Sequence, residues 1–232
     1  MERESQRNRG RLSGHVYDSI KERLLDGDYP AGSRVSVEAL RAEFTVSKQP
    51  IMEALRQLAA DGIVEILPQI GCVVVGYSPR DVEDFFEIFA AFEGALAGAA
   101  AQRRTPRDVE GLQRVLDSVT ARSNRAGHDE SATYRRENRE FHAAIHRIVA
   151  SPIMADSSRR LWDLSDFLIN TTGTPLPLSY VTSERHREHG EIVKAIADGD
   201  AGKARALMEA HIRETPKHIA GGATTASAAS AS

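Results

Sequence analysis

The segment from residue 42 to residue 75 limits the fold of this chain more than any other. A helix that ends near Phe44 is followed by the turn Thr45-Val46-Ser47 and by a second helix with Pro50 in its first turn. Proline is tolerated there because its missing N–H would have no partner inside the helix. Two runs rich in β-branched residues then flank a turn that contains a proline and a glycine. This order of elements is typical of a winged helix-turn-helix and indicates binding to DNA.

The sequence places this first domain at residues 12–76. Apolar side chains recur at helical spacing up to the turn Pro30-Ala31-Gly32 and predict an opening helix. The dipeptide Arg34-Val35 is expected as a short strand. Ser36 can cap a helix over residues 37–44, because a serine hydroxyl accepts a hydrogen bond from a backbone N–H of the first turn.

Ser47 is expected to cap the next helix in the same way. The buried side of this helix carries Ile51, Leu55 and Leu58, so its opposite side must face outward. The outward side carries Lys48, Gln49, Met52 and Arg56. The runs Ile63–Leu67 and Cys72–Val75 are expected to pair as a hairpin and to form the wing.

Net charge alone would mislead here. The formal charge is −3 and the sequence pI is about 6.3, which argues against a nucleic-acid binder if the chain is treated as one body. Basic residues nevertheless gather in two places, and these are Arg3, Arg7, Arg9 and Arg11 near the start and Arg34, Arg41, Lys48 and Arg56 around the outward helix. Acidic residues lie between them, so we expect a basic patch and modest non-specific affinity for DNA.

Cys72 is the only cysteine of the chain. A disulfide framework is therefore excluded, and we expect the reducing cytosol as the compartment. The first residues are polar, and no later segment approaches the length needed to cross a bilayer. We expect a cytoplasmic protein with no membrane partner.

The second domain is expected at residues 81–219, after a linker at 77–80. Helical periodicity recurs in block after block, and the later blocks are Pro106–Ser123, Glu130–Val149, Ile153–Ile169, Tyr180–Ala197 and Asp200–Ile219. Such blocks predict a helical bundle. Residues 1–11 are expected as a flexible arm, and residues 220–232, only Gly, Ala, Ser and Thr, as a disordered tail. The predicted fold class is mainly α, a winged helix-turn-helix followed by an all-helical bundle.

Three histidines lie on apolar faces of three different predicted helices, at His142, His189 and His211. Neutral imidazole is a strong ligand for zinc and nickel, and an oxygen at Asn138, four residues before His142, can supply a fourth contact. The alternative is that each histidine is a core residue bonded to a backbone carbonyl. The residues alone leave both readings open, because spacing across helices is invisible in a sequence.

A three-histidine site with open positions would also suit a metal-dependent enzyme. The carboxylates of Glu137, Glu140 and Glu188 adjoin the histidines in the sequence but are expected on other helix faces. No acid or base with an obvious catalytic role is therefore expected, which speaks against the enzyme. A third reading makes the metal itself the signal.

Taken together, these segments resemble the GntR family of bacterial transcription regulators, in its FadR-like branch with an FCD ligand-binding domain. The resemblance covers about residues 12 to 219. Its markers are Pro30-Ala31-Gly32-Ser33-Arg34-Val35, Val46-Ser47-Lys48-Gln49-Pro50-Ile51-Met52-Glu53-Ala54-Leu55, Asp61-Gly62-Ile63-Val64, Gly71, Phe141-His142, Glu188-His189 and Ala210-His211.

The resemblance implies a nucleoid-associated homodimer, in most such proteins a repressor, whose reading helices enter successive major grooves of a short inverted repeat. The implied DNA-contacting residues are Arg34, Ser47, Lys48, Gln49, Met52, Arg56 and, at the wing tip, Gly71. The resemblance also implies a small-molecule effector, an organic acid or related metabolite, that binds in the helical domain and alters the spacing of the two DNA-binding heads.

For the helical domain the resemblance implies a divalent metal, zinc or nickel, held by Asn138, His142, His189 and His211. The effector is expected near Phe89, Arg135 and His186.

Several residues depart from the family pattern. Lys48 and Met52 stand where arginine is usual, so bidentate recognition of guanine is lost at both places. Gln49 replaces the usual threonine and could read an adenine. Asn138 replaces an aspartate, and its amide oxygen is a weaker ligand than a carboxylate. Phe89 replaces an arginine that could pair with an acidic effector, which makes a simple dicarboxylate a less safe expectation.

Overall fold

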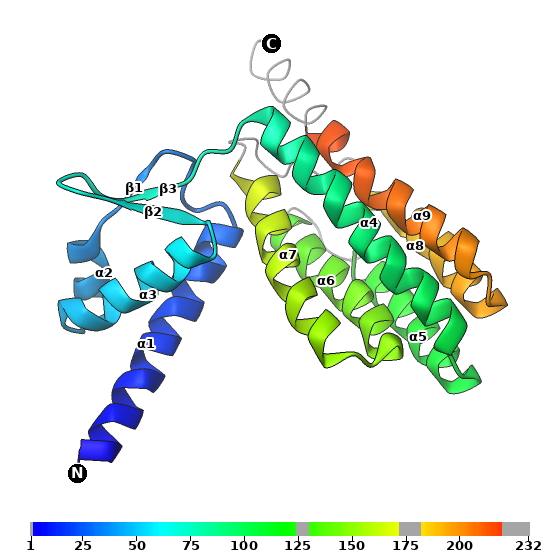
Figure 1. The fold of residues 1–232 in the computed structure, drawn as a ribbon, viewed down its shortest axis with the longest axis horizontal. Helices are drawn as coiled ribbons and strands as arrows, with labels where there is room; N and C mark the ends of the chain where they lie inside the picture. The colour runs from blue at the N-terminus through cyan, green and yellow to red at the C-terminus, as the bar shows by residue number, and fades with distance from the viewer. Residues whose placement is uncertain (1, 124–129, 172–181, 220–232) are drawn as a thin grey trace. The chain divides into compact units, whose positions relative to one another are not determined.

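A computed structural model describes residues 2–123, 130–171 and 182–219 of the chain (Figure 1). It divides into two compact units, one of residues 1–77 with 166–173 and the other of residues 78–165 with 174–232. The predicted disordered tail, residues 220–232, lies outside the described residues. No helix in the described part of the chain has both the length and the apolar character that a membrane span requires.

The first unit is a winged helix-turn-helix, as predicted. Its elements are α1 (Glu2–Leu25), β1 (Arg34–Val35), α2 (Val37–Phe44), α3 (Lys48–Ala60), β2 (Val64–Leu67) and β3 (Gly71–Val74). The strands form an antiparallel sheet in the order β1-β3-β2. Fully buried aliphatic side chains of α1 and α3 form its core, among them Val16, Ile20, Leu24, Ile51, Leu55 and Leu58.

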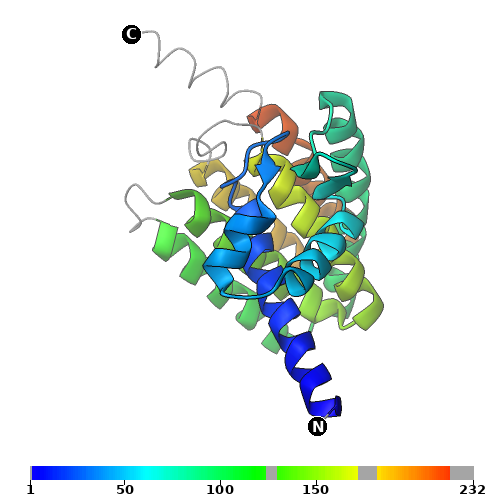
Figure 2. The same cartoon turned by 90° about the vertical axis from the view of Figure 1, so that its left-hand side faces the viewer.

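Helix α1 begins at Glu2 and not at Leu12. Residues 2–11 therefore continue this helix, whereas the sequence suggested a separate arm. Glutamate, arginine and glutamine, which dominate this segment, are good helix formers and can extend a helix whose apolar stripe is already anchored. In both views α1 extends beyond α2 and α3 at its amino-terminal end (Figures 1 and 2).

A tight turn separates α2 from α3. Ser36 caps α2 as expected, since its hydroxyl accepts from the N–H of Ala39 at 3.2 Å. Thr45 ends α2 in the left-handed conformation, with φ of 53° and ψ of 45°. Its neighbour Val46 donates a backbone hydrogen bond to Arg41 at 3.2 Å. This turn fixes the direction in which α3 leaves.

The second unit contains α4 (Pro79–Arg103), α5 (Pro106–Ser123), α6 (Glu130–Val149), most of α7 (Pro152–Asn170), α8 (Thr182–Asp198) and α9 (Ala201–Arg213). Helix α4 begins inside the predicted linker, because Ser78 and Asp81 form a capping box around Pro79. Helix α9 ends at Arg213, before the predicted Ile219, at a turn on Glu214 that a further helical segment follows.

Helices α4 and α9 make the most extensive contact of this bundle (Figure 1). Gly94 and Gly98 of α4 allow it: a Cβ atom at Gly94 would meet the side chain of Glu209 and lie 3.2 Å from the backbone oxygen of Arg205. The small-residue stretch of α4 thus brings α9, with His211, into the centre of the bundle.

Candidate functional site

The first candidate site is the outward face of α3. Ser47 occupies the N-cap position with an extended backbone, but its side chain makes no capping hydrogen bond. The expected cap is therefore absent, and the physical reason is Pro50 at the third helical position, since proline has no N–H to donate to the capping hydroxyl. The exposed Ser47 hydroxyl remains available to a partner.

The outward face itself follows the predicted pattern. Ile51, Ala54, Leu55 and Leu58 are buried. Ser47, Lys48, Gln49 and Arg56 are exposed, whereas Met52 is half-buried. The polar side of α3 is therefore not covered by its own chain.

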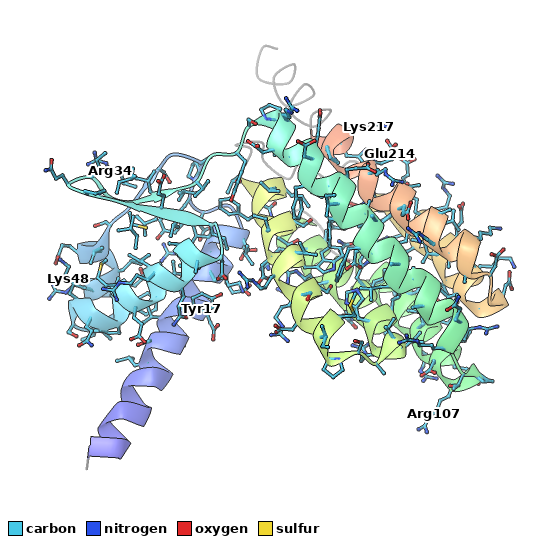
Figure 3. The ribbon with its side chains drawn as sticks, viewed as in Figure 1. Tyr17, Arg34, Lys48, Arg107, Glu214 and Lys217 are labelled. Carbon is cyan, nitrogen blue, oxygen red and sulfur yellow. The ribbon has the colours of Figure 1, made fainter. Side chains whose placement is uncertain are left out.

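Two acidic residues at α3 are hydrogen-bonded to side chains of α1. Glu53 accepts a hydrogen bond from the hydroxyl of Ser13 at 2.8 Å, and Asp61 accepts one from Tyr17 at 2.6 Å. In the part of the chain that the structure describes, no carboxylate forms an ion pair with Arg34, Lys48 or Arg56. Their positive charges are thus left for an external anion (Figure 3 labels Arg34 and Lys48).

Arg34 lies next to the wing. Strand β1 pairs with β3, and Arg34 lies opposite Val73. Gly71 begins β3 at the exposed wing tip with φ of 103°, a conformation that favours glycine. The tip can therefore approach a partner through its backbone.

The second candidate site lies inside the helical unit, where His142 of α6, His189 of α8 and His211 of α9 meet. Their ligand atoms all lie within 4.8 Å of one another, and the Nε2 atoms of His189 and His211 are 3.1 Å apart. All three rings are buried. The prediction that three helices bring these histidines to one interior point is confirmed.

Several buried polar atoms of the four predicted ligand residues have no hydrogen-bond partner among the described residues. They are both ring nitrogens of His142, Nδ1 of His189 and the amide oxygen Oδ1 of Asn138. Burial lowers the pKa of His142, His189 and His211 below the ordinary value, so the rings are neutral and carry free lone pairs. Unsatisfied buried acceptors around one point are what a divalent cation requires, and this donor set fits zinc or nickel.

Two carboxylates lie behind these histidines. Oε2 of Glu188 is 2.7 Å from Nδ1 of His211, and Oε2 of Glu93 is 3.5 Å from Nδ1 of His142. A carboxylate behind a histidine fixes its tautomer and directs the other nitrogen toward a metal. The expectation that Glu188 lies on another face is wrong, because α9 packs against α8 and carries His211 to it. Glu93, which lies on α4, has no local sequence signal.

Glu93 is the centre of a larger buried network. It accepts hydrogen bonds from His146 Nε2 at 2.9 Å, Ser158 Oγ at 3.0 Å and Trp162 Nε1 at 3.2 Å. Burial would raise the pKa of Glu93, but its hydrogen bond with His146 and the polar contact with His142, 3.5 Å away, lower it below the ordinary value. The carboxylate therefore stays ionised.

The guanidinium of Arg185, fully buried on α8, is another feature that sequence reasoning missed. It donates to the backbone oxygen of His211 at 2.6 Å, to Thr215 Oγ1 at 3.1 Å and to Glu188 at 3.3 Å. These bonds hold α9 against α8 and so position two of the three histidines.

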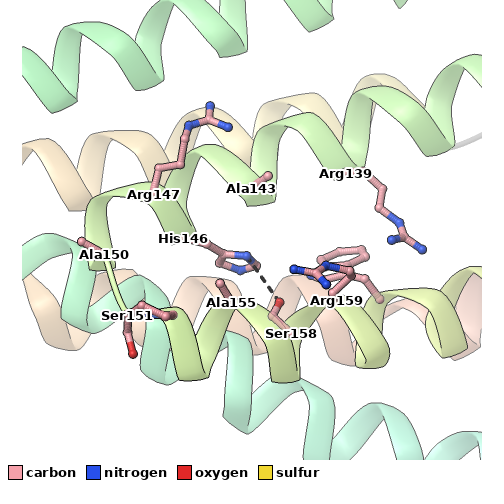
Figure 4. Close-up of a pocket in the computed structure, with 11 residues that line it drawn as sticks. Arg139, Ala143, His146, Arg147, Ala150, Ser151, Ala155, Ser158 and Arg159 are labelled. Atoms are coloured by element: carbon pink, nitrogen blue, oxygen red, sulfur yellow. Dashed lines mark hydrogen bonds between the residues drawn. The ribbon is translucent and has the colours of Figure 1, made fainter. Parts of the chain in front are cut away.

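The three residues expected at the effector occupy different surroundings. Phe89 is buried against Trp162, with ring centroids 5.0 Å apart. His186 lines a hollow between α5 and α8, and Arg135 is half-buried on α6. A cavity of about 570 Å³ between α6 and α7 is lined by none of them (Figure 4).

Both parts of the chain match known protein families. The family described as bacterial regulatory proteins, gntR family, matches residues 12–74, and the FCD domain matches residues 84–214. An uncharacterized HTH-type transcriptional regulator of Agrobacterium vitis is 30% identical over 112 residues, 48% of this chain and 65% of that protein. The transcriptional repressor GlaR of Escherichia coli is 24% identical over 84% of this chain and 90% of its own length. The solved structure of E. coli McbR/YncC superposes with a TM-score of 0.70 at 21% identity, over 92% of this chain and 98% of that one.

Proposed function

This chain belongs to the GntR family of bacterial regulatory proteins and carries an FCD domain, and on that basis we propose that it is a ligand-responsive repressor that binds a short inverted repeat as a homodimer. The observation that carries the proposal is the uncovered polar face of α3. Its cations have no acidic partner in the described residues, and a wing lies beside them.

The proposed DNA contacts divide into two kinds. Lys48, Arg34 and Arg56 supply charge for phosphates, and the free Ser47 hydroxyl and the wing backbone at Gly71 add hydrogen bonds to the sugar-phosphate chain. Gln49 suits an adenine edge in the major groove, whereas half-buried Met52 offers an apolar contact to a thymine methyl. Such a helix would favour operators richer in A·T than an arginine-bearing helix does.

The proposed metal site consists of His142, His189 and His211, with Asn138 as the fourth protein ligand. A divalent ion bound by the three histidines would link α6, α8 and α9 through coordination bonds. The unsatisfied lone pairs of this site support the proposal.

The effector acts in this proposal by binding one arrangement of the DNA-binding heads better than another. A tenfold preference is worth about 1.4 kcal/mol at each site, and two coupled sites double that value. A ligand of modest affinity is therefore enough to release DNA.

A metal-sensing regulator is a second candidate, favoured by the same three histidines. The metal-dependent enzyme is less well supported, because Glu188 and Glu93, the carboxylates behind the histidines, are already engaged in hydrogen bonds. Operator affinity measured with and without a chelator separates a sensory metal from a structural one.

The test of DNA binding uses a palindrome near the protein's own gene. Lys48→Ala should weaken binding at least tenfold at low salt and reduce the slope of log affinity against log salt, because one cation per head no longer displaces a counterion. Fluorescence anisotropy of labelled DNA measures both quantities. Lys203→Ala, an exposed lysine of the helical unit, is the matched control. Unchanged affinity in Lys48→Ala would remove this residue from the interface.

A further inference from the structure

The cavity between α6 and α7 is lined by three arginines, Arg139, Arg147 and Arg159, and by no acidic residue. The charge of Arg139 is already met, because its guanidinium forms an ion pair with Asp163 at 2.8 Å. The rest of the wall is largely small and apolar, with Trp162 and Ala143 among its residues. A volume of about 570 Å³ is within the range of pockets that hold small molecules.

The guanidinium of Arg159 is the one most readily recruited by a ligand. Its partner in the chain is Asp156, at 3.3 Å, and both side chains are exposed. An exposed ion pair contributes little stability, so an incoming anion can replace it at small cost. In Figure 4 Arg159 reaches into the space between the helices, near His146 and Ser158, whose side chains are 3.3 Å apart.

We infer that this cavity binds a small monocarboxylate with an apolar body, whose carboxylate pairs with Arg159 and whose apolar part lies against Trp162 and Ala143. The inference deepens the proposed function, because it names the effector class and its site. None of the candidate metal ligands lines the cavity, so the ligand binds beside the metal centre and not on it.

Residues of the cavity wall are nevertheless connected to the metal centre through Glu93. His146, Ser158 and Trp162 line the cavity, and all three donate to Glu93, which faces His142. A ligand that shifts this wall therefore acts on a metal ligand through one carboxylate.

The experiment uses the fluorescence of Trp162, the only tryptophan of the chain. The full-length protein is titrated with butyrate, hexanoate, octanoate and benzoate, and with hexanamide as the uncharged counterpart of hexanoate. We expect saturable changes with at least one carboxylate and binding of hexanamide at least tenfold weaker, because the amide forms no ion pair with Arg159. If none of the four carboxylates saturates, the inference is overturned.

Variants locate the site. Arg159→Ala should weaken carboxylate binding at least tenfold and Ala143→Phe should abolish it, whereas Arg114→Ala, an exposed arginine of α5, should leave it unchanged. His189→Ala should retain binding, and its loss there with retention in Ala143→Phe would place the carboxylate on the metal instead. Calorimetry checks these affinities, and thermal unfolding checks that each variant is folded.

Operator binding, measured separately, distinguishes carboxylate binding in the cavity from an effector role of the bound carboxylate. Carboxylate binding that leaves DNA affinity unchanged would confirm the cavity and contradict the effector role. DNA binding without carboxylate binding would overturn the cavity inference and leave the regulator intact.

Discussion

Asn138 is the unusual member of the candidate metal centre, because its side chain carries no charge. It lies one helical turn before His142 on α6, and its buried amide oxygen has no hydrogen-bond partner among the described residues. Together with three neutral imidazoles, this amide gives a ligand set with no negative charge to balance the positive charge of a divalent ion. A carboxylate of nearly the same size would supply one.

Asn138→Asp should therefore raise metal affinity, by about tenfold or more, a size of effect that changes around metal sites commonly produce. Competition against a chromophoric chelator measures the affinity, with zinc and nickel tested separately. His189→Ala serves as the opposite control and should lose stoichiometric metal on elemental analysis. If Asn138→Asp matches the parent protein while His189→Ala still retains the ion, these residues do not form the site.

At the level of elements, the contact between α4 and α9 decides whether His211 reaches the other two histidines. It depends on glycines where any larger residue would collide. Gly94 has no room for a Cβ atom, since Glu209 and the backbone of Arg205 lie against it, whereas a Cβ at Gly111 of α5 would meet only Arg114, at 3.9 Å.

The same substitution should consequently have opposite effects at these two glycines. Gly94→Ala should destabilise the protein by about 1–3 kcal/mol through overpacking, and Gly111→Ala should stabilise it by up to about 1 kcal/mol through helix propensity. Urea unfolding followed by circular dichroism gives both values. Equal shifts of one sign would contradict the close approach of α4 and α9.

Helical periodicity located most elements well, and its failures have clear causes. Helices α5 and α6 begin and end at the predicted residues. The apolar spacing continues to Ile219, so the turn at Glu214 left no trace in the pattern. The three histidines were predictable from their positions on apolar faces. Their partners Glu93 and Glu188 were not, because each contact joins two helices and depends on how they pack.

For the whole molecule, the buried histidines tie stability to pH. The pKa values of His142, His189 and His211 lie below the ordinary value when the chain is folded. Below about pH 6.5 the unfolded chain therefore binds protons that the folded chain does not, and stability falls as pH falls. His186 and His218 are shifted the same way and add to the effect.

In excess chelator, the urea midpoint should drop between pH 7.5 and pH 5.5. The free energy of unfolding should fall by up to about 1.4 kcal/mol per pH unit for each histidine that titrates. Protein saturated with metal should hold its midpoint to lower pH, because the ion competes with protons for the same nitrogens. Glu93, whose pKa is also lowered, loses its contribution only at more acidic pH. A midpoint that is constant over this interval would show that the rings are not buried and neutral.

Pro50 leaves the first turn of α3 without a side-chain cap. Because it removes the amide that Ser47 would cap, the first turn of α3 presents its remaining donors to solvent. A phosphate oxygen can take the place of the missing acceptor and also meets the positive end of the helix dipole. A DNA phosphate would thus accept hydrogen bonds from the uncapped N–H groups, and binding to DNA would order the first turn of α3.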